Sequence, residues 1–193
     1  GDPALGEAFR QERDIHRYTA SLIYGVEERD VTSEMRGAMK AINYGIIYGM
    51  SGHGLARELG ISYEGADTFI RAYFERYGAV RAFLDAQIAH AKETGYVQTL
   101  LGRRRYIPEL QSPDLATRQF GERIAVNAPI QGTAADLIKR AMVQLAAALQ
   151  ARHLRSRMIM QVHDELVLEG PADEQAEAVA LVRQIMEHAI DLT

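Results

Sequence analysis

Apolar residues recur every three to four positions along most of this chain, a spacing typical of helices with one buried face. Hydroxyl and acidic residues stand where several of these runs begin, and glycines stand where several end. We expect a break before residue 133 because Pro129 disfavours helical backbone at the residue that precedes it. The predicted helices cover residues 3–25 (as one helix or two), 33–48, 62–78, 79–94, 113–127, 133–152 and 172–190.

Two pairs of short apolar segments have the character of strands. Each pair encloses a short turn, so each predicts a hairpin. The four predicted strands are residues 96–101 with 104–107, and 157–162 with 166–169. Residues 158–162 are apolar on both faces, which predicts a strand buried in its sheet. The predicted fold class is therefore α+β, dominated by helix, with a small antiparallel sheet.

The composition is that of a globular protein. The chain has 193 residues, of which 47% are apolar and 25% charged, so disordered and fibrous architectures are excluded. No run approaches the ~18–20 apolar residues that a membrane span needs, and we expect no membrane partner. The lack of cysteine excludes disulfides, thiolate metal sites and cysteine nucleophiles.

The net charge of −4 hides a strong asymmetry along the chain. Residues 95–160 carry ten Lys and Arg against four Asp and Glu, whereas residues 161–193 carry one against eight. Most of the basic residues are arginine, whose guanidinium binds phosphate through paired hydrogen bonds. A basic middle segment in an acidic protein indicates a local anionic partner.

The predicted helix 33–48 carries four chemically useful side chains at every fourth position: Arg36, Lys40, Tyr44 and Tyr48. Steps of four advance only ~40° around a helix, so all four form one stripe about 18 Å long. The cations lie nearer the N-terminus, where the helix dipole also favours anions. This order suits a nucleotide, with its phosphates at one end and its sugar and base at the other. A solvated basic face that runs into half-buried tyrosines is the alternative.

The turn His163-Asp164-Glu165 places two adjacent carboxylates after an apolar strand. Two such acids repel each other unless a cation joins them, and Mg²⁺ prefers carboxylate oxygens. A solvated acidic turn is one alternative. A metal phosphohydrolase of the His-Asp type is another, but the other histidines lack metal-binding spacing.

Three segments together resemble the bacterial DNA polymerase I family, the family A DNA polymerases. They are residues 36–49 with the stripe above, residues 127–136 (Asn-Ala-Pro-Ile-Gln-Gly-Thr-Ala-Ala-Asp) and residues 161–165 (Gln-Val-His-Asp-Glu). The resemblance covers essentially the whole chain, with every segment in the family's order. It implies a fingers subdomain over residues 1–122 that contains the nucleotide-binding helix 33–48. It further implies part of a palm over residues 123–193 that contains a metal-binding hairpin at 157–169.

The resemblance also implies roles for individual residues. Arg36, Lys40 and His16 would bind the triphosphate of the incoming deoxynucleotide. Tyr44 would pack against its sugar and base, and Tyr48 would lie near the new base pair. Residues implied to contact primer and template are Arg103, Arg104, Arg118, Arg123, Asn127, Gln131 and His163.

The implied reaction is DNA-templated DNA synthesis by two-metal phosphoryl transfer to the primer 3′-hydroxyl. Asp164 and Glu165 would ligate Mg²⁺, with two ions in the complete enzyme, and Lys40 would join them as a catalytic residue. The implied partners are primer-template DNA and deoxynucleoside triphosphates, with no obligate protein partner. The implied location is the bacterial cytoplasm at the nucleoid, with an organelle as the alternative.

The sequence departs from the family pattern in two places. The family's upstream Asp-Tyr-Ser-x-x-Glu segment, which supplies another metal-binding aspartate, is not among these 193 residues. We therefore expect the chain alone to be inactive in primer extension, and a non-catalytic nucleic-acid-binding module is the alternative function. Tyr44 stands where many members have phenylalanine, which implies weaker discrimination against dideoxynucleotides.

Overall fold

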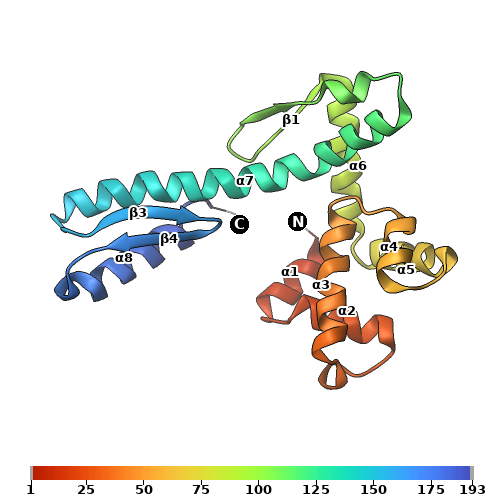
Figure 1. Cartoon of the computed structure of the whole chain (residues 1–193), viewed down its shortest axis with the longest axis horizontal. Coiled ribbons are helices and arrows are strands. Elements are labelled where there is room, and N and C mark those ends of the chain that lie inside the picture. The colour runs from red at the N-terminus through yellow and green to blue at the C-terminus, as the bar shows by residue number, and fades with distance from the viewer. Residues whose placement is uncertain (1, 192–193) are drawn as a thin grey trace. The chain divides into compact units, whose positions relative to one another are not determined.

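The computed structural model describes residues 2–191, which fall into two compact units (Figure 1). Unit 1 is formed by Gly1–Val97 and Arg105–Asn127. Unit 2 is formed by Gln98–Arg104 and Ala128–Thr193. The structure is mainly helical, with two small antiparallel sheets, which confirms the predicted α+β class. The assignment of residues 1–122 and 123–193 to fingers and palm stays a prediction.

Unit 1 is built from short helices whose starts are fixed by side chains. Its elements are α1 (Pro3–Arg10), α2 (Ile15–Tyr24), η1 (Glu28–Asp30), α3 (Ser33–Ile47), α4 (Gly52–Leu59), α5 (Tyr63–Arg76), α6 (Gly78–Thr94) and η2 (Pro108–Gln111). Asp14 and Thr32 accept hydrogen bonds from the first amides of α2 and α3, as their sequence positions predict. The predicted helix ends at Gly95 and near Tyr48 are also confirmed.

Helix α4 was not predicted, because Gly52 and Gly54 indicated only an end to the preceding helix. In the structure, Ser51 accepts a hydrogen bond from the amide of Gly54, and Gly60 closes the helix with φ of 65°. Leu55 is fully buried, and its packing offsets the low helix propensity of the two glycines.

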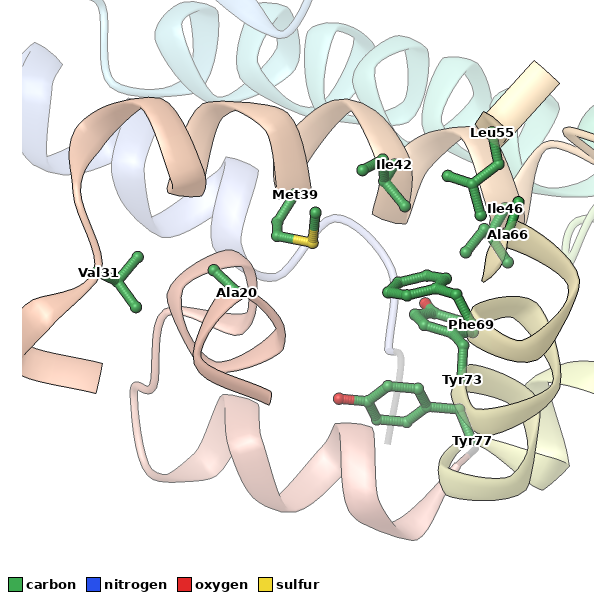
Figure 2. Packing of buried hydrophobic residues seen from close by; sticks show 10 residues of the cluster. All are labelled: Ala20, Val31, Met39, Ile42, Ile46, Leu55, Ala66, Phe69, Tyr73 and Tyr77. Atoms are coloured by element: carbon green, nitrogen blue, oxygen red, sulfur yellow. The ribbon is translucent and has the colours of Figure 1, made fainter. Parts of the chain in front are cut away.

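The core of unit 1 forms between α3 and the helices around it (Figure 2). Met39, Ile42 and Ile46 project from one face of α3 and are almost fully buried. Their partners come from α2, α4, α5 and the segments between helices: Ala20, Val31, Leu55, Ala66, Phe69, Tyr73 and Tyr77. This packing fixes which face of α3 remains outside.

One long helix, α7 (Leu115–Ala151), replaces the two helices predicted at 113–127 and 133–152. The predicted break at Pro129 is wrong. A proline inside a helix loses one hydrogen bond and crowds the carbonyl four residues earlier, but burial on both sides outweighs that loss. Val126 is buried in unit 1, and Ala141 and Leu145 are buried in unit 2. The Thr133 hydroxyl donates to the Pro129 carbonyl at 2.6 Å.

Unit 2 packs a hairpin against helices. Strands β3 (Arg157–Val162) and β4 (Glu165–Glu169) pair antiparallel, and the chain then forms η3 (Ala172–Glu174) and α8 (Gln175–Glu187). The buried residues of the cluster that joins them are Leu145, Leu149 and Leu181, against which Met158, Leu166 and Leu168 pack. A second hairpin consists of β1 (Tyr96–Gln98) and β2 (Arg104–Tyr106).

The prediction that β3 is buried on both faces is wrong. Ile159 and Met160 are more than half exposed, and Val162 is 38% exposed. Among residues 2–191 the sheet contains only β3 and β4, and no other element there buries these three side chains. Apolar runs on both faces predict burial by some partner, but they do not say whether that partner lies in the same segment.

No helix in the described part of the chain is long and apolar enough to cross a membrane.

Candidate nucleotide-binding and metal-binding sites

The outer face of α3 carries the predicted stripe. Arg36 and Tyr48 are partly exposed, and Lys40 and Tyr44 are exposed, whereas the opposite face holds the core residues described above. The rings of Tyr44 and Tyr48 are nearly parallel, with their centroids 6.3 Å apart. The structure therefore brings the two cations and the two aromatic rings onto one continuous surface of unit 1.

Asp14 links this surface to α2. Its carboxylate accepts the amide hydrogen bonds of His16 and Arg17 at the start of α2 and also accepts from Arg36 Nε at 2.5 Å. Partial burial raises the pKa of Asp14, but the hydrogen bond from Arg36 and those from the two amides outweigh it, so the pKa lies below its ordinary value. The charged Asp14 thereby holds the N-terminus of α2 beside the N-terminal half of α3.

His16 lies beside the stripe as a result. Its ring centroid is 5.7 Å from that of Tyr44. Burial lowers the pKa of His16, the positive charges of Arg36 and Lys40 lower it further, and the negative charge of Asp14 opposes them. The imidazole is therefore neutral near pH 7 and can donate one hydrogen bond.

Among residues 2–191, Lys40 forms no ion pair, so its charge is available to a ligand.

Gly45 does not leave room for a ligand beside Tyr44, because a side chain already occupies that space. A Cβ at Gly45 would lie 2.3 Å from Met50 Cε, so the Met50 side chain fills the space. Glycine occupies position 49 for a different reason, because its φ of 80° is one that few other residues adopt. It lies beside Arg123, and both line a cavity of about 410 Å³ within unit 1.

The predicted DNA contacts of α7 differ in their surroundings. Arg118 donates hydrogen bonds to the carbonyls of Ser112 and Pro113, so it also supports the start of the helix. Arg123 and Gln131 are exposed, and Asn127 lies four residues from each. Four-residue spacing places these three on one face of α7.

The predicted contacts of the β1–β2 hairpin, Arg103 and Arg104, are both exposed. Arg103 forms an ion pair with the buried Asp136, whose carboxylate also accepts from the Thr99 hydroxyl at 2.6 Å. This pair fixes the loop of the hairpin, residues 98–104, to the part of α7 that belongs to unit 2, so much of the Arg103 charge is already neutralised. Arg104 lies in β2 with an exposed side chain.

The β3–β4 turn presents the predicted metal ligands at its tip. His163 has a φ of 51°, and Gln161 Nε2 donates to its carbonyl at 2.5 Å. Asp164 lies in the turn and Glu165 begins β4, and both are exposed. Neither forms an ion pair within the described residues, and no group of three or more metal-ligating side chains occurs there. Their free carboxylate oxygens fit Mg²⁺ as partial ligands.

The site residues are thus divided between the units. Those predicted to bind nucleotide all belong to unit 1, and those predicted to bind metal belong to unit 2. One residue that contacts the candidate nucleotide site was not predicted: Asn43, whose amide nitrogen lies 3.1 Å from His16 Nδ1. A polar residue among the apolar positions of the inner face of α3 is the sequence signal that could have identified it.

Comparison with known proteins supplies the family. The chain matches DNA polymerase family A over residues 1–193. It is 48% identical over 191 residues to DNA polymerase I of Bacillus caldotenax, covering 99% of this chain and 22% of that protein. It is 47% identical over 192 residues to the thermostable DNA polymerase I of Thermus filiformis, covering 100% of this chain and 23% of that protein.

A solved structure is similar as well. It is the polymerase domain of Pol1 from M. smegmatis in complex with DNA primer-template and dNTP. The TM-score is 0.93 at 46% identity, and the match covers 99% of this chain and 34% of that one. The chain therefore belongs to DNA polymerase family A. It spans about a fifth of the length of the curated relatives named above.

Proposed function

We propose that this chain forms the nucleotide-binding part and a portion of the metal site of a DNA-templated DNA polymerase. The reaction adds deoxynucleoside triphosphates to a primer 3′-hydroxyl. The observation that carries the proposal is the stripe on α3, where Arg36, Lys40 and Tyr44 face outward with His16 beside them. Membership of family A and the bound primer-template and dNTP in the M. smegmatis structure support it.

In this proposal the triphosphate lies along the N-terminal half of the stripe. Arg36 and Lys40 neutralise its charge, and the neutral His16 donates one hydrogen bond to a phosphate oxygen. Tyr44 packs against the sugar and base, and Tyr48 supports Tyr44 from the next turn of the helix. Lys40 stabilises the negative charge that develops on the phosphates during transfer.

Asp164 and Glu165 hold catalytic Mg²⁺ in this proposal. When bound, two such ions supply Lewis-acid activation of the 3′-hydroxyl and stabilise the leaving pyrophosphate. Asp164 and Glu165 would offer carboxylate oxygens as ligands from the tip of the hairpin. Two adjacent acids provide too few ligands for two ions, and we propose that residues 1–193 alone do not extend a primer. The missing ligand would be a carboxylate from outside this chain's 193 residues.

We infer the DNA contacts from the exposure and the charge of the individual side chains. Arg104 and Arg123 contact backbone phosphates, and Asn127, Gln131 and His163 lie near the primer and template bases. Arg103 and Arg118 contribute to DNA binding indirectly. Arg103 holds the β1–β2 hairpin in place, and Arg118 supports the start of α7. No obligate protein partner is required, and the site of action is the bacterial nucleoid.

A chimaera tests the proposal, with this chain in place of the matching segment of a full-length family A polymerase. We expect templated extension by the chimaera and none by the 193-residue chain. Lys40→Ala in the chimaera should raise KM for the nucleotide and lower kcat, together about 100-fold in kcat/KM, because Lys40 contacts charge in both ground and transition states. Lys139→Ala is the matched control, since Lys139 is an exposed residue of α7.

A folded chimaera without extension, or equal effects of the two lysine substitutions, would contradict the polymerase proposal. If such a chimaera still bound DNA, the non-catalytic nucleic-acid-binding module would replace it.

A further inference from the structure

Asn43 is a polar side chain in the buried face of α3. It is only 4% exposed and lies between the core positions Ile42 and Ile46. Its carbonyl oxygen Oδ1 is buried without a hydrogen-bond partner in the described residues. An unpartnered buried carbonyl is unfavourable, so an apolar residue of similar size would suit this position better if folding alone mattered. The amide nitrogen must therefore explain why an asparagine is here.

Thr19 on α2 determines which end of the Asn43 amide faces that helix. The Thr19 hydroxyl has one proton, and it lies 2.7 Å from the carbonyl of Ile15, to which it donates. At its longer contact of 3.4 Å with Asn43, the Thr19 oxygen can then only accept. The group of Asn43 that faces Thr19 is therefore the NH₂ group and not the carbonyl.

The same NH₂ group lies 3.1 Å from His16 Nδ1. It has two hydrogens, one for Thr19 and one for His16. Since Asn43 donates, His16 Nδ1 must accept, and a nitrogen that accepts carries no proton. In the neutral imidazole the proton must then be on Nε2, which points away from Asn43.

We propose that Asn43 is a positioning residue that holds His16 in the Nε2–H tautomer. The ring then presents an N–H donor, and not a lone pair, beside the stripe of Arg36 and Lys40. The contact of the ring with Tyr44 restricts its rotation, so both the tautomer and the direction of the donor are set before a ligand arrives. A lone pair in that place would repel a phosphate oxygen. The role toward phosphate rests on the proposed nucleotide function, but the tautomer does not.

The tautomer can be read directly from the ¹⁵N resonances of the histidine ring in the 193-residue chain, at a pH where His16 is neutral. We expect His16 Nδ1 to give an unprotonated signal and Nε2 a protonated one. His188 is an internal control with the opposite expectation, because its Nδ1 lies 2.8 Å from the Gln184 carbonyl, which can only accept. His188 should therefore show a protonated Nδ1. A His16→Gln variant assigns the signals.

Two variants separate positioning from folding. Asn43→Asp replaces the donor by a carboxylate that only accepts, so the His16 proton should move to Nδ1. Asn43→Leu removes the donor without replacing it, so both tautomers should be populated, while the melting temperature stays within a few degrees of the parent. A parent chain with a protonated His16 Nδ1, or an unchanged His16 pattern in Asn43→Asp, would overturn the proposal.

Binding of inorganic triphosphate gives the functional readout. We expect Asn43→Leu to bind about threefold more weakly and Asn43→Asp about tenfold or more, since the aspartate variant offers phosphate a lone pair and adds a negative charge. Triphosphate affinities that are unchanged in both variants would overturn the role toward phosphate. If the parent chain bound no triphosphate or deoxynucleoside triphosphate, the proposed nucleotide function would fail, whereas the tautomer result would stand separately.

Discussion

Residues of the α3 stripe in unit 1 are held in place by neighbouring side chains, whereas those at the β3–β4 tip in unit 2 are not held by ion pairs within the described residues. Arg36 is held by Asp14, and His16 is held by Asn43 and Tyr44, all within one packed unit. Asp164 and Glu165 stand exposed at a turn, with no ion pair in the described residues. A site that needs only positioned cations and rings can be complete within one unit. A site for two metal ions needs more acids than this hairpin brings.

The largest expected effect comes from the hairpin tip. In the chimaeric polymerase, Asp164→Asn should lower kcat by about 10³-fold or more, because it removes the charge of a proposed metal ligand. Nucleotide binding to unit 1 should change little, since Asp164 belongs to the other unit. Steady-state extension and nucleotide binding measured on the same preparations separate the two quantities. Glu169→Gln, at the far end of β4, is the control and should retain kcat. Equal losses in both variants would contradict a specific role for the tip.

We expect the base of the β3–β4 hairpin to be held rigidly by close packing, in contrast to its exposed tip. A Cβ at Gly170 would lie 2.2 Å from Ser156 Oγ and 3.0 Å from its backbone Cα, so Gly170→Ala forces the backbone to move. We expect a loss of about 2–3 kcal/mol in the free energy of unfolding of unit 2, measured by urea denaturation. Gly6→Ala is the control: no atom lies within 4 Å of its Cβ, and alanine favours a helix. Gly170→Ala with the stability of the parent would show that the base is as loosely held as the tip.

A smaller effect is expected at the sugar end of the stripe. Tyr44 offers a hydroxyl near the position proposed for the nucleotide sugar. In the chimaera, Tyr44→Phe should increase discrimination against dideoxynucleotides by about tenfold, the worth of one hydrogen bond. Competing incorporation of dideoxy- and deoxynucleotides gives the ratio. If the two enzymes discriminated equally, the hydroxyl would have no role in sugar selection.

The smallest effect concerns acid stability at the start of α8. The Glu174 carboxylate accepts hydrogen bonds from the Arg155 side chain and amide and from Ser156, which lower the pKa of Glu174 to about 2. Because the folded pKa lies below the unfolded value of 4.5, this stabilisation is complete above pH 4.5 and is lost as the pH falls toward 2. The stability difference between the parent and Glu174→Gln should therefore shrink with acid. Urea midpoints at about pH 7 and about pH 3 measure it.

Glu187→Gln, whose carboxylate is 4.0 Å from Arg183, should show little difference at either pH. A Glu174→Gln difference that stayed constant with pH would contradict the assignment.

The sequence predicted the features that depend on local periodicity and caps. The four-residue spacing from Arg36 to Tyr48 correctly placed one exposed face on α3, and Asp14 and Thr32 correctly marked helix starts. Features set by distant packing were missed. Pro129 continues α7 because buried residues lie on both sides of it, and α4 forms because Leu55 finds a core.

The candidate site shows the same limit. Sequence spacing selected the residues of the stripe, but it did not show that Met50 fills the space beside Gly45. It also could not show that Asn43 reaches His16, because that contact joins positions 27 apart on two helices. The exposure of β3 was missed because an apolar strand indicates burial without naming its partner.

We propose that unit 1 carries a nucleotide site by itself. The most direct test is a titration of the ¹⁵N-labelled 193-residue chain with deoxynucleoside triphosphate, followed by amide and side-chain NMR shifts. We predict saturable shifts at His16, Lys40 and Tyr44, with no shift at the β3–β4 tip until Mg²⁺ is added. Shifts that begin at the tip without metal, or none along α3 at saturating nucleotide, would contradict the account.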